Sequence, residues 1–290
     1  MWNENEPIRL AVQPDVEDMQ VHVEHGLVRR DYPVHTHAFY ETFIFVDGKA
    51  KHVRGDQAYD LHRGDVFAVG GHTAHGFLHV QDMEIINLMY DPGFFRRSHS
   101  EIRRIPGFDA CFLVEPERGR RRADRPVLRL GERDLNYAVM MADFIQEQQS
   151  RSRSDMRPAI RMHFMALFSF LATRYESQEM AAETAAISRA LAYMESHLEE
   201  PLRVSQIAAE TYFSVRQLER AFHGCFGESP MQYLKKIRLE KACSILKEGR
   251  SVADTARECG FEDPAYFTRV FRAQYGCLPM DVRKGRQNDG

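Results

Sequence analysis

An internal repeat near the C-terminus constrains the fold of this 290-residue chain more than any other feature of its sequence. The first copy has eight matched positions: Val204, Ala208, Glu210, Phe213, Arg220, Phe222, Gly227 and Pro230. The same residue types recur at Val252, Ala256, Glu258, Phe261, Arg269, Phe271, Gly276 and Pro279. The offset is 48 positions up to the phenylalanine and 49 after it. So many matches at one spacing predict a duplicated structural unit.

Each copy reads as a short helix, a tight turn and a second helix, which is the helix-turn-helix pattern. In the first copy, helix 204–210 is followed by a turn and by Ser214, an N-cap residue for helix 215–225. In the second copy, helix 252–259 ends at Gly260, and Asp263 caps a helix that begins at Pro264. A connecting helix lies between the copies, and its expected apolar face holds Met231, Leu234, Ile237, Ala242 and Ile245.

The second helix of such a unit lies in the major groove of double-stranded DNA, and its N-terminal half faces the bases. The candidate DNA-binding residues are Ser214, Val215, Arg216, Gln217, Arg220, Asp263, Pro264, Ala265, Tyr266, Thr268 and Arg269. Arginine can bond guanine and glutamine can bond adenine. For Arg220 and Arg269, contacts with bases and contacts with phosphates are both open, and either serves DNA binding. The core of the units should hold Leu218, Phe222, Phe267 and Phe271.

The N-terminal third has a different pattern, with short apolar segments separated by glycine and aspartate, which predicts a β-sandwich or barrel. The expected strands lie around 21–28, 42–46, 53, 58–61, 66–69 and 84–89. Beyond residue 132 the apolar period becomes helical, with one helix over 135–148 and another that starts near Pro158. This second helix could pack on the β domain, mediate self-association, or do both.

These patterns predict three parts: an effector-sensing domain over 1–117, a linker and helical dimerisation segment over 118–185, and a DNA-binding domain over 186–286. The last part carries a small positive net charge in a chain whose total is −3, as expected of a DNA reader. The five cysteines form no CxxC pair, which argues against a zinc knuckle. No apolar run approaches the roughly 20 residues of a membrane span, and the acidic start has no signal-peptide core, so we expect a cytoplasmic protein.

A group of titratable residues stands out within the β region. His35, His37 and Glu41 are spaced so that one face of a strand can present all three, and a second strand can bring His75 opposite. Three imidazoles and a carboxylate suit a divalent metal such as Mn, Fe, Ni or Zn. The same residues could instead hold a polyol by hydrogen bonds, without metal. We expect surface or strand-edge positions for His22, His25, His52, His62, His72 and His79.

Several motifs of the helical repeat resemble the signature of the AraC/XylS family of bacterial transcription regulators. They are Phe213-Ser214, the Arg-Leu-x-x-Ala run at 238–242, Gly260-Phe261-Glu262-Asp263, the run 266–271 and Gly276-Cys277-Leu278-Pro279. The resemblance covers about 100 residues. It implies a sequence-specific DNA-binding regulator that contacts RNA polymerase and activates transcription, as a homodimer.

The histidine spacing in turn resembles the two motifs of the cupin fold, a small β-barrel. This chain departs from them at Arg29, Gly70 and His79, where cupins have glycine, proline and asparagine. The expected fold class is therefore α+β with two domains: an N-terminal cupin-like β-barrel, a helical linker and an all-α domain with two helix-turn-helix units. The whole chain is similar to the rhamnose-responsive regulators of the AraC/XylS family, which implies a sugar effector such as rhamnose. Further candidates for the pocket are Arg29, Asp31, Tyr40 and Lys51.

A metal-dependent enzyme and an architectural DNA-binding protein are the alternatives to a ligand-controlled regulator. The four-residue cluster alone would also suit a cupin-type metal-dependent enzyme, an isomerase or dioxygenase that acts on a small sugar or acid. A dedicated enzyme has no need for two DNA-reading units, so we expect a protein that is not an enzyme. A purely architectural DNA-binding protein, for its part, has no use for a polar-lined pocket.

Overall fold

The computed structural model describes residues 8–9, 21–71, 73–91, 94, 102, 105, 107–118, 125–150, 157–176 and 182–284. The chain divides into two compact units, one of Met1–Phe94 with Glu101–Thr184 and one of Phe95–Ser100 with Ala185–Gly290. The first unit is rich in β-structure and the second is helical, which confirms the α+β two-domain fold class. Parts of the predicted domains, including 119–124, 177–181 and 285–286, lie outside the described residues, and the three domain boundaries stay predictions.

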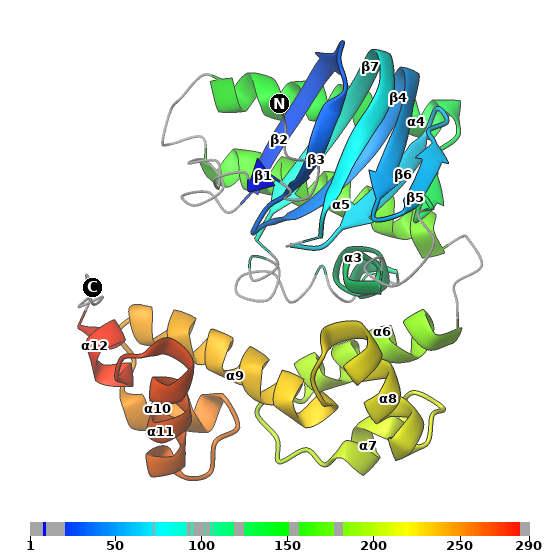
Figure 1. The fold of residues 1–290 in the computed structure, drawn as a ribbon. Helices are drawn as coiled ribbons and strands as arrows, with labels where there is room; N and C mark the ends of the chain where they lie inside the picture. The colour runs from blue at the N-terminus through cyan, green and yellow to red at the C-terminus, as the bar shows by residue number, and fades with distance from the viewer. Residues whose placement is uncertain are drawn as a thin grey trace. The chain divides into compact units, whose positions relative to one another are not determined.

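The described strands of the first unit form one eight-stranded sheet (Figure 1). Its strands are β1 (Ile8–Arg9), β2 (Val21–Val28), β3 (Tyr32–Thr36), β4 (Tyr40–Arg54), β5 (Gln57–Asp60), β6 (Asp65–Val69), β7 (His75–Tyr90) and β8 (Leu128–Arg129). The antiparallel pair of β4 and β7 forms its centre. Strands β2 and β3 pair with β7, and β5 and β6 pair with β4. Each long central strand is thus flanked by two shorter ones.

The two central strands are longer than the sequence pattern predicts, at 15 residues for β4 and 16 for β7. The turn signal Asp47-Gly48 lies inside β4, where the register with β7 shifts repeatedly between Phe45 and Lys51. Gly48 has φ +94°, and a Cβ built on it would lie 2.2 Å from the carbonyl oxygen of Asp82. A side chain cannot fit there, so the glycine permits a β-bulge instead of ending a strand.

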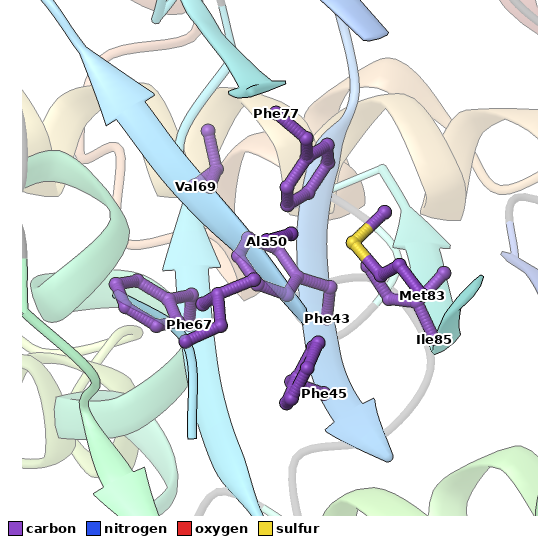
Figure 2. Packing of buried hydrophobic residues seen from close by; sticks show 9 residues of the cluster. Phe43, Phe45, Ala50, Phe67, Val69, Phe77, Met83 and Ile85 are labelled. Atoms are coloured by element: carbon purple, nitrogen blue, oxygen red, sulfur yellow. The ribbon is translucent and has the colours of Figure 1, made fainter. Parts of the chain in front are cut away.

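A cluster of aromatic and aliphatic side chains between the strands forms the core of this unit (Figure 2). The rings of Phe43 and Phe67 stack with centroids 5.0 Å apart, and Phe77 meets Phe43 edge-on at 5.2 Å. Met83 and Ile85 of β7 complete the packing. Phe43, Phe45 and Ala50 belong to the same cluster although an uninterrupted strand would place Ala50 on the other face. The bulge in β4 therefore reverses which residues point inward.

Helices α4 (Glu132–Ser150) and α5 (Arg157–Glu176) lie alongside β2 (Figure 1). Gln149 of α4 bonds the backbone of β2 in both directions, since its Oε1 accepts from the Val23 N–H and its Nε2 donates to the Val23 carbonyl, both at 3.0 Å. At Val23 the free backbone edge of β2 is thus satisfied by a helix, and a covered strand edge is protected from other pairings. The expected apolar face of α5 is buried in the unit, namely Ile160, Phe164, Leu167, Phe168 and Leu171.

The second unit contains helices only, in its described part. They are α6 (Ala182–Ser196), α7 (Val204–Ala209), α8 (Val215–Phe226), α9 (Pro230–Lys247), α10 (Val252–Glu258), α11 (Pro264–Tyr275) and α12 (Pro279–Arg283). Helices α7 and α8 form the first helix-turn-helix unit, α10 and α11 the second, and α9 connects them (Figure 1). On α9, Leu234, Ile237 and Ala242 are buried as expected, whereas Met231 is 37% exposed. None of the described helices of the chain is long and apolar enough to cross a membrane.

Candidate functional site

Four side chains from three neighbouring strands meet inside the first unit. His35 lies near the end of β3, His37 directly after it, Glu41 near the start of β4 and His75 at the start of β7. All four are at most 5% exposed. They offer one ligand atom each, and these four atoms lie within 4.8 Å of one another. The structure therefore brings together the four residues that the sequence spacing singles out, and three nitrogens with one carboxylate oxygen suit a divalent transition metal.

Backbone carbonyls fix two of the imidazole rings. The Nδ1 of His37 lies 2.7 Å from the carbonyl oxygen of Phe39, and the Nδ1 of His35 lies 3.0 Å from that of Pro33. A carbonyl oxygen only accepts, so in both rings Nδ1 carries a proton that it donates. When these rings are neutral, each Nε2 is left with a lone pair, which is the form that binds a metal or accepts a hydrogen bond.

The electrostatics of the cluster follow from its burial. Burial would raise the pKa of Glu41, but the neighbouring His37 and His75 outweigh it and hold this pKa well below the usual value. Burial lowers the pKa of His75 to about 4, against the opposing effect of Glu41. Burial, followed by the proximity of His75, lowers the pKa of His35 to about 4 as well. Near neutral pH the cluster thus contains an ionised carboxylate beside two neutral imidazoles.

The cluster forms one wall of a cavity of about 300 Å³ between β2, β3 and β7. His35, His37 and Glu41 line it on one side. The other lining residues are Glu24, Gly26, Leu27, Val28, Tyr32, Phe39, Phe77, Met83, Ile85, Asn87 and Met89. Two of the lining side chains have a buried oxygen without a hydrogen-bond partner, Glu41 Oε2 and Asn87 Oδ1. A small molecule with polar groups at one end and an apolar body would satisfy both kinds of surface.

Two of the basic residues expected in the pocket lie on the surface instead. Arg29 is exposed, and its Nε lies 3.2 Å from Asp82 Oδ1. The Nζ of Lys51 lies 2.9 Å from Asp60 Oδ1, across the β4–β5 ladder. Both predictions require correction, because each cation is paired with a carboxylate outside the cavity and neither residue lines it.

Tyr40 and Asp31 also lie away from the cavity. The hydroxyl of Tyr40 donates to the carboxylate of Glu117. Asp31 Oδ1 accepts from the backbone N–H of Val80 at 2.9 Å and so fixes the start of β3 to β7. These two residues have structural contacts of their own, and their prediction as pocket residues is corrected in the same way.

His52 is a residue of the site that the sequence analysis misplaced. We expected it at the surface or at a strand edge, but its side chain on β4 is fully buried. Its Nε2 lies 3.3 Å from Nδ1 of His75. The bulge around Gly48 explains the error, because the resulting change of alternation turns His52 toward the interior. His72 lies outside the described residues.

The first helix-turn-helix unit presents polar residues at the start of α8. Ser214 is its N-cap, as predicted, and its hydroxyl accepts from the Gln217 N–H. Gln217 Oε1 in turn accepts from the Ser214 N–H at 2.9 Å, so this side chain is used in a capping box in the free protein. Arg216 and Arg220 are exposed, and neither forms an ion pair with a described residue. Leu218 on the opposite face is fully buried, as expected.

The second unit also presents an exposed helix start, with fewer polar side chains. Asp263 caps α11 by accepting from the Ala265 N–H at 2.8 Å, and Pro264 is the first residue of the helix. Thr268 donates its hydroxyl to the Pro264 carbonyl at 2.9 Å. The guanidinium of Arg269 lies over the ring of Tyr266, 5.3 Å from its centroid. The expected core residues of this helix, Phe267 and Phe271, are fully buried.

Both halves of the chain match models of known protein families. Residues 207–285 match the helix-turn-helix domain model, and residues 20–213, more than half of the chain, match the AraC-like ligand binding domain. The chain belongs to the AraC family. As an AraC-family protein, it is a DNA-binding transcription regulator with a cupin-like ligand-binding domain, and the resemblance read from the sequence is confirmed.

Curated relatives are similar to this AraC-family chain over nearly its whole length. The "HTH-type transcriptional activator RhaS" of Escherichia coli O81 (strain ED1a) is 26% identical over 267 residues, which cover 92% of each protein. The protein of the same description from Klebsiella pneumoniae (strain 342) is 27% identical over 270 residues, again with 92% of each covered.

Solved structures are also similar to this chain. An AraC-type transcriptional regulator from Chromobacterium violaceum is 31% identical and covers 36% of this chain and 95% of its own, with a TM-score of 0.34. ToxT from Vibrio cholerae O395 is 13% identical and covers 93% of this chain and 99% of its own, with a TM-score of 0.37.

Proposed function

We propose that this regulator activates transcription when a small-molecule effector occupies the cavity between β2, β3 and β7. The proposal rests on one observation, which is that two features occur together in this chain. One is a pair of helix-turn-helix units with exposed arginines at the start of a reading helix. The other is a cavity whose buried oxygens on Glu41 and Asn87 lack hydrogen-bond partners. Buried polar groups of this kind are costly without a partner, and a bound effector would supply one.

The names of the relatives support the direction of control. The Escherichia coli and Klebsiella relatives are named transcriptional activators, so we assign activation to this chain. Contact with RNA polymerase is what the resemblance to the AraC/XylS family implies, and we propose it here. We further propose that it works in the cytoplasm as a homodimer, and that its two units read neighbouring major grooves about one helical turn, or roughly 34 Å, apart. The eleven residues predicted at the DNA surface remain our candidate contacts.

A sugar is the first effector class to test, because the chain resembles the rhamnose-responsive regulators. The experiment is thermal unfolding of the full chain against a panel of sugars and small acids. A compound that binds only the folded state raises the unfolding midpoint by mass action. An effector that controls the regulator must also change its affinity for DNA selected from a random pool. Binding without any change in DNA affinity would contradict the proposal.

A cupin-type enzyme is the second candidate, and only the four-residue cluster favours it. The family and the named relatives are transcription regulators, so we propose that the chain is not an enzyme. Turnover of a small sugar or acid by the purified chain, lost in His37→Ala, would reverse this ranking.

A further inference from the structure

A groove of about 780 Å³ lies between the two helix-turn-helix units. Three segments line it: residues 201–203 before α7, the first half of α9, and residues 260–263 with the first turns of α11. Helix α7 belongs to the first helix-turn-helix unit and α11 to the second. The groove is therefore formed by both units together with the helix that connects them.

The side chains that line this groove carry more positive than negative charge. Four are cationic and two are carboxylates, namely Arg203, Lys235, Arg238 and Arg269 with Glu262 and Asp263. None of the four cations forms an ion pair with a carboxylate of the described residues. A cluster of cations that is not neutralised attracts anions, so we expect an occupant with several negative charges.

The cations of the groove differ in how freely they can reach a ligand. Nε of Arg238 donates to the Leu198 carbonyl at 2.9 Å and Nη2 to the Glu200 carbonyl at 2.5 Å. This guanidinium is thus fixed against the backbone, and it keeps its charge because arginine stays protonated in proteins. Arg203 and Lys235 are exposed, so their head groups can bind a ligand at the surface without first breaking an ion pair.

Double-stranded DNA is the polyanion that the position of the groove favours. Tyr266 and Arg269, two of the candidate DNA contacts on α11, also line the groove, so it is continuous with the surface expected to face DNA. A duplex whose neighbouring major grooves receive α8 and α11 passes across the face between the two units. Along that stretch it presents its sugar-phosphate backbone, with one negative charge per roughly 1.7 Å of helix axis.

We propose that Arg203 and Lys235 contact phosphates of the DNA between the two major grooves, and that the charge of Arg238 adds to the attraction. Neither contact residue is among the eleven candidates that the helix-turn-helix pattern predicts. The inference rests on the proposed function in one respect, namely that both units read the same duplex. Phosphate contacts position a protein on DNA without reading its sequence, so the groove contributes affinity and no sequence preference.

The test measures binding of the full chain to two duplexes by fluorescence anisotropy at several salt concentrations. One duplex is selected from a random pool by the wild type, and the other has a scrambled sequence. Arg203→Gln and Lys235→Gln should each reduce the slope of log affinity against log salt by about 0.9, the value for one phosphate contact. Each should also weaken binding to both duplexes by the same factor. Lys247→Gln is the matched control, since Lys247 is an exposed lysine of α9 outside the groove, and it should keep the wild-type slope.

Arg203→Lys keeps the charge and should keep the wild-type slope, which separates the loss of charge from a change in the fold. An unchanged slope in both Arg203→Gln and Lys235→Gln would overturn the proposal, and an unchanged slope in one of them would overturn it for that residue. A loss confined to the selected duplex would also overturn it, because it would make these residues base readers.

Arg216→Ala, measured alongside, distinguishes this failure from that of the proposed function. If Arg216→Ala weakens binding to the selected duplex while both groove variants bind like the wild type, only the groove proposal is wrong. A wild-type chain that binds neither duplex would overturn both proposals.

Discussion

The two helix-turn-helix units share a pattern of backbone features but differ in their surfaces. Both begin the second helix with a side-chain N-cap, and both end it at a left-handed glycine, Gly227 with φ +76° and Gly276 with φ +72°. Their turns also match, since Tyr212 and Gly260 both have positive φ. The repeat therefore retains the residues that shape the backbone and its core.

The surfaces differ in how many polar groups remain available. In the first unit Arg216 and Arg220 are exposed. In the second Arg269 is exposed as well, but its guanidinium lies over Tyr266, and Thr268 bonds its own helix. We infer that the first unit reads bases, and that the second mainly positions the protein on the phosphate backbone. The two units thus share a backbone pattern and present different side chains at the start of their second helices.

The largest expected effects test whether the two scaffolds are equally well packed. Phe222→Ala and Phe271→Ala each remove a fully buried ring. Each should lower the free energy of unfolding by about 3–5 kcal/mol, measured by urea denaturation. Gln274→Ala, at an exposed position of α11, is the control and should stay within about 0.5 kcal/mol of the wild type. A large loss for only one phenylalanine would show that the units are not equivalent.

The next effect tests the division of tasks on DNA. Arg216→Ala and Arg220→Ala should each weaken specific binding by about 1–3 kcal/mol, and Arg269→Ala by less, because its guanidinium is already stacked on Tyr266. Fluorescence anisotropy on DNA selected by the wild-type chain measures this. Arg257→Ala on α10, whose side chain pairs with Asp254, serves as the control. A greater loss for Arg269→Ala would reverse the assignment.

Substitutions at the two turns should change the free energy of unfolding in opposite directions. Tyr212 has φ +59° and is 88% exposed. Tyr212→Gly should therefore raise the free energy of unfolding, by about 0.5–1 kcal/mol, since a left-handed conformation costs a side chain roughly 1–2 kcal/mol. Gly260→Ala should lower it by at least that amount, because a Cβ there would lie 2.6 Å from the Leu198 carbonyl oxygen. Thermal and urea unfolding measure both changes. If the two variants shift the free energy of unfolding in the same direction, the prediction is wrong.

The smallest effects concern the caps. Ser214→Ala and Asp263→Ala should each cost about 1 kcal/mol of stability, the usual value of an N-cap. Gln217→Ala should cost a few tenths more than Tyr266→Ala, the change at the matching position, since only Gln217 completes a capping box. An equal cost in urea denaturation would mean that the box contributes nothing, and that the glutamine is available for DNA.

The helical half could be predicted from the sequence almost residue by residue. Its signals are local: a capping serine at 214, an aspartate–proline pair at 263–264 and a glycine at 260 each fix one chain reversal or helix start. The structure agrees with them to within a residue or two at the helix ends. The side-chain contacts of Gln217 and Arg269 could not be predicted from the sequence, because they depend on rotamers that no spacing rule specifies.

The β half was harder to predict because its decisive interactions are non-local. The spacing of His35, His37 and Glu41 was sufficient to group them, but not to place Arg29 or Lys51, whose partners lie on other strands or turns. The Asp47-Gly48 signal is the same for a hairpin turn and for a bulge. Only the approach of Asp82 from β7 distinguishes the two, and the burial of His52 depends on that distinction.

Arg238 of α9 ties the segment before the first unit to the connecting helix. Its Nε donates to the Leu198 carbonyl at 2.9 Å and its Nη2 to the Glu200 carbonyl at 2.5 Å, directly beside the Gly260 turn of the second unit. We expect this bracing to restrict how far the two units can move relative to each other. If they read neighbouring major grooves as proposed, the two half-sites should keep a fixed helical phase. Five inserted base pairs, about half a turn of the duplex, would place one half-site on the opposite side of the DNA.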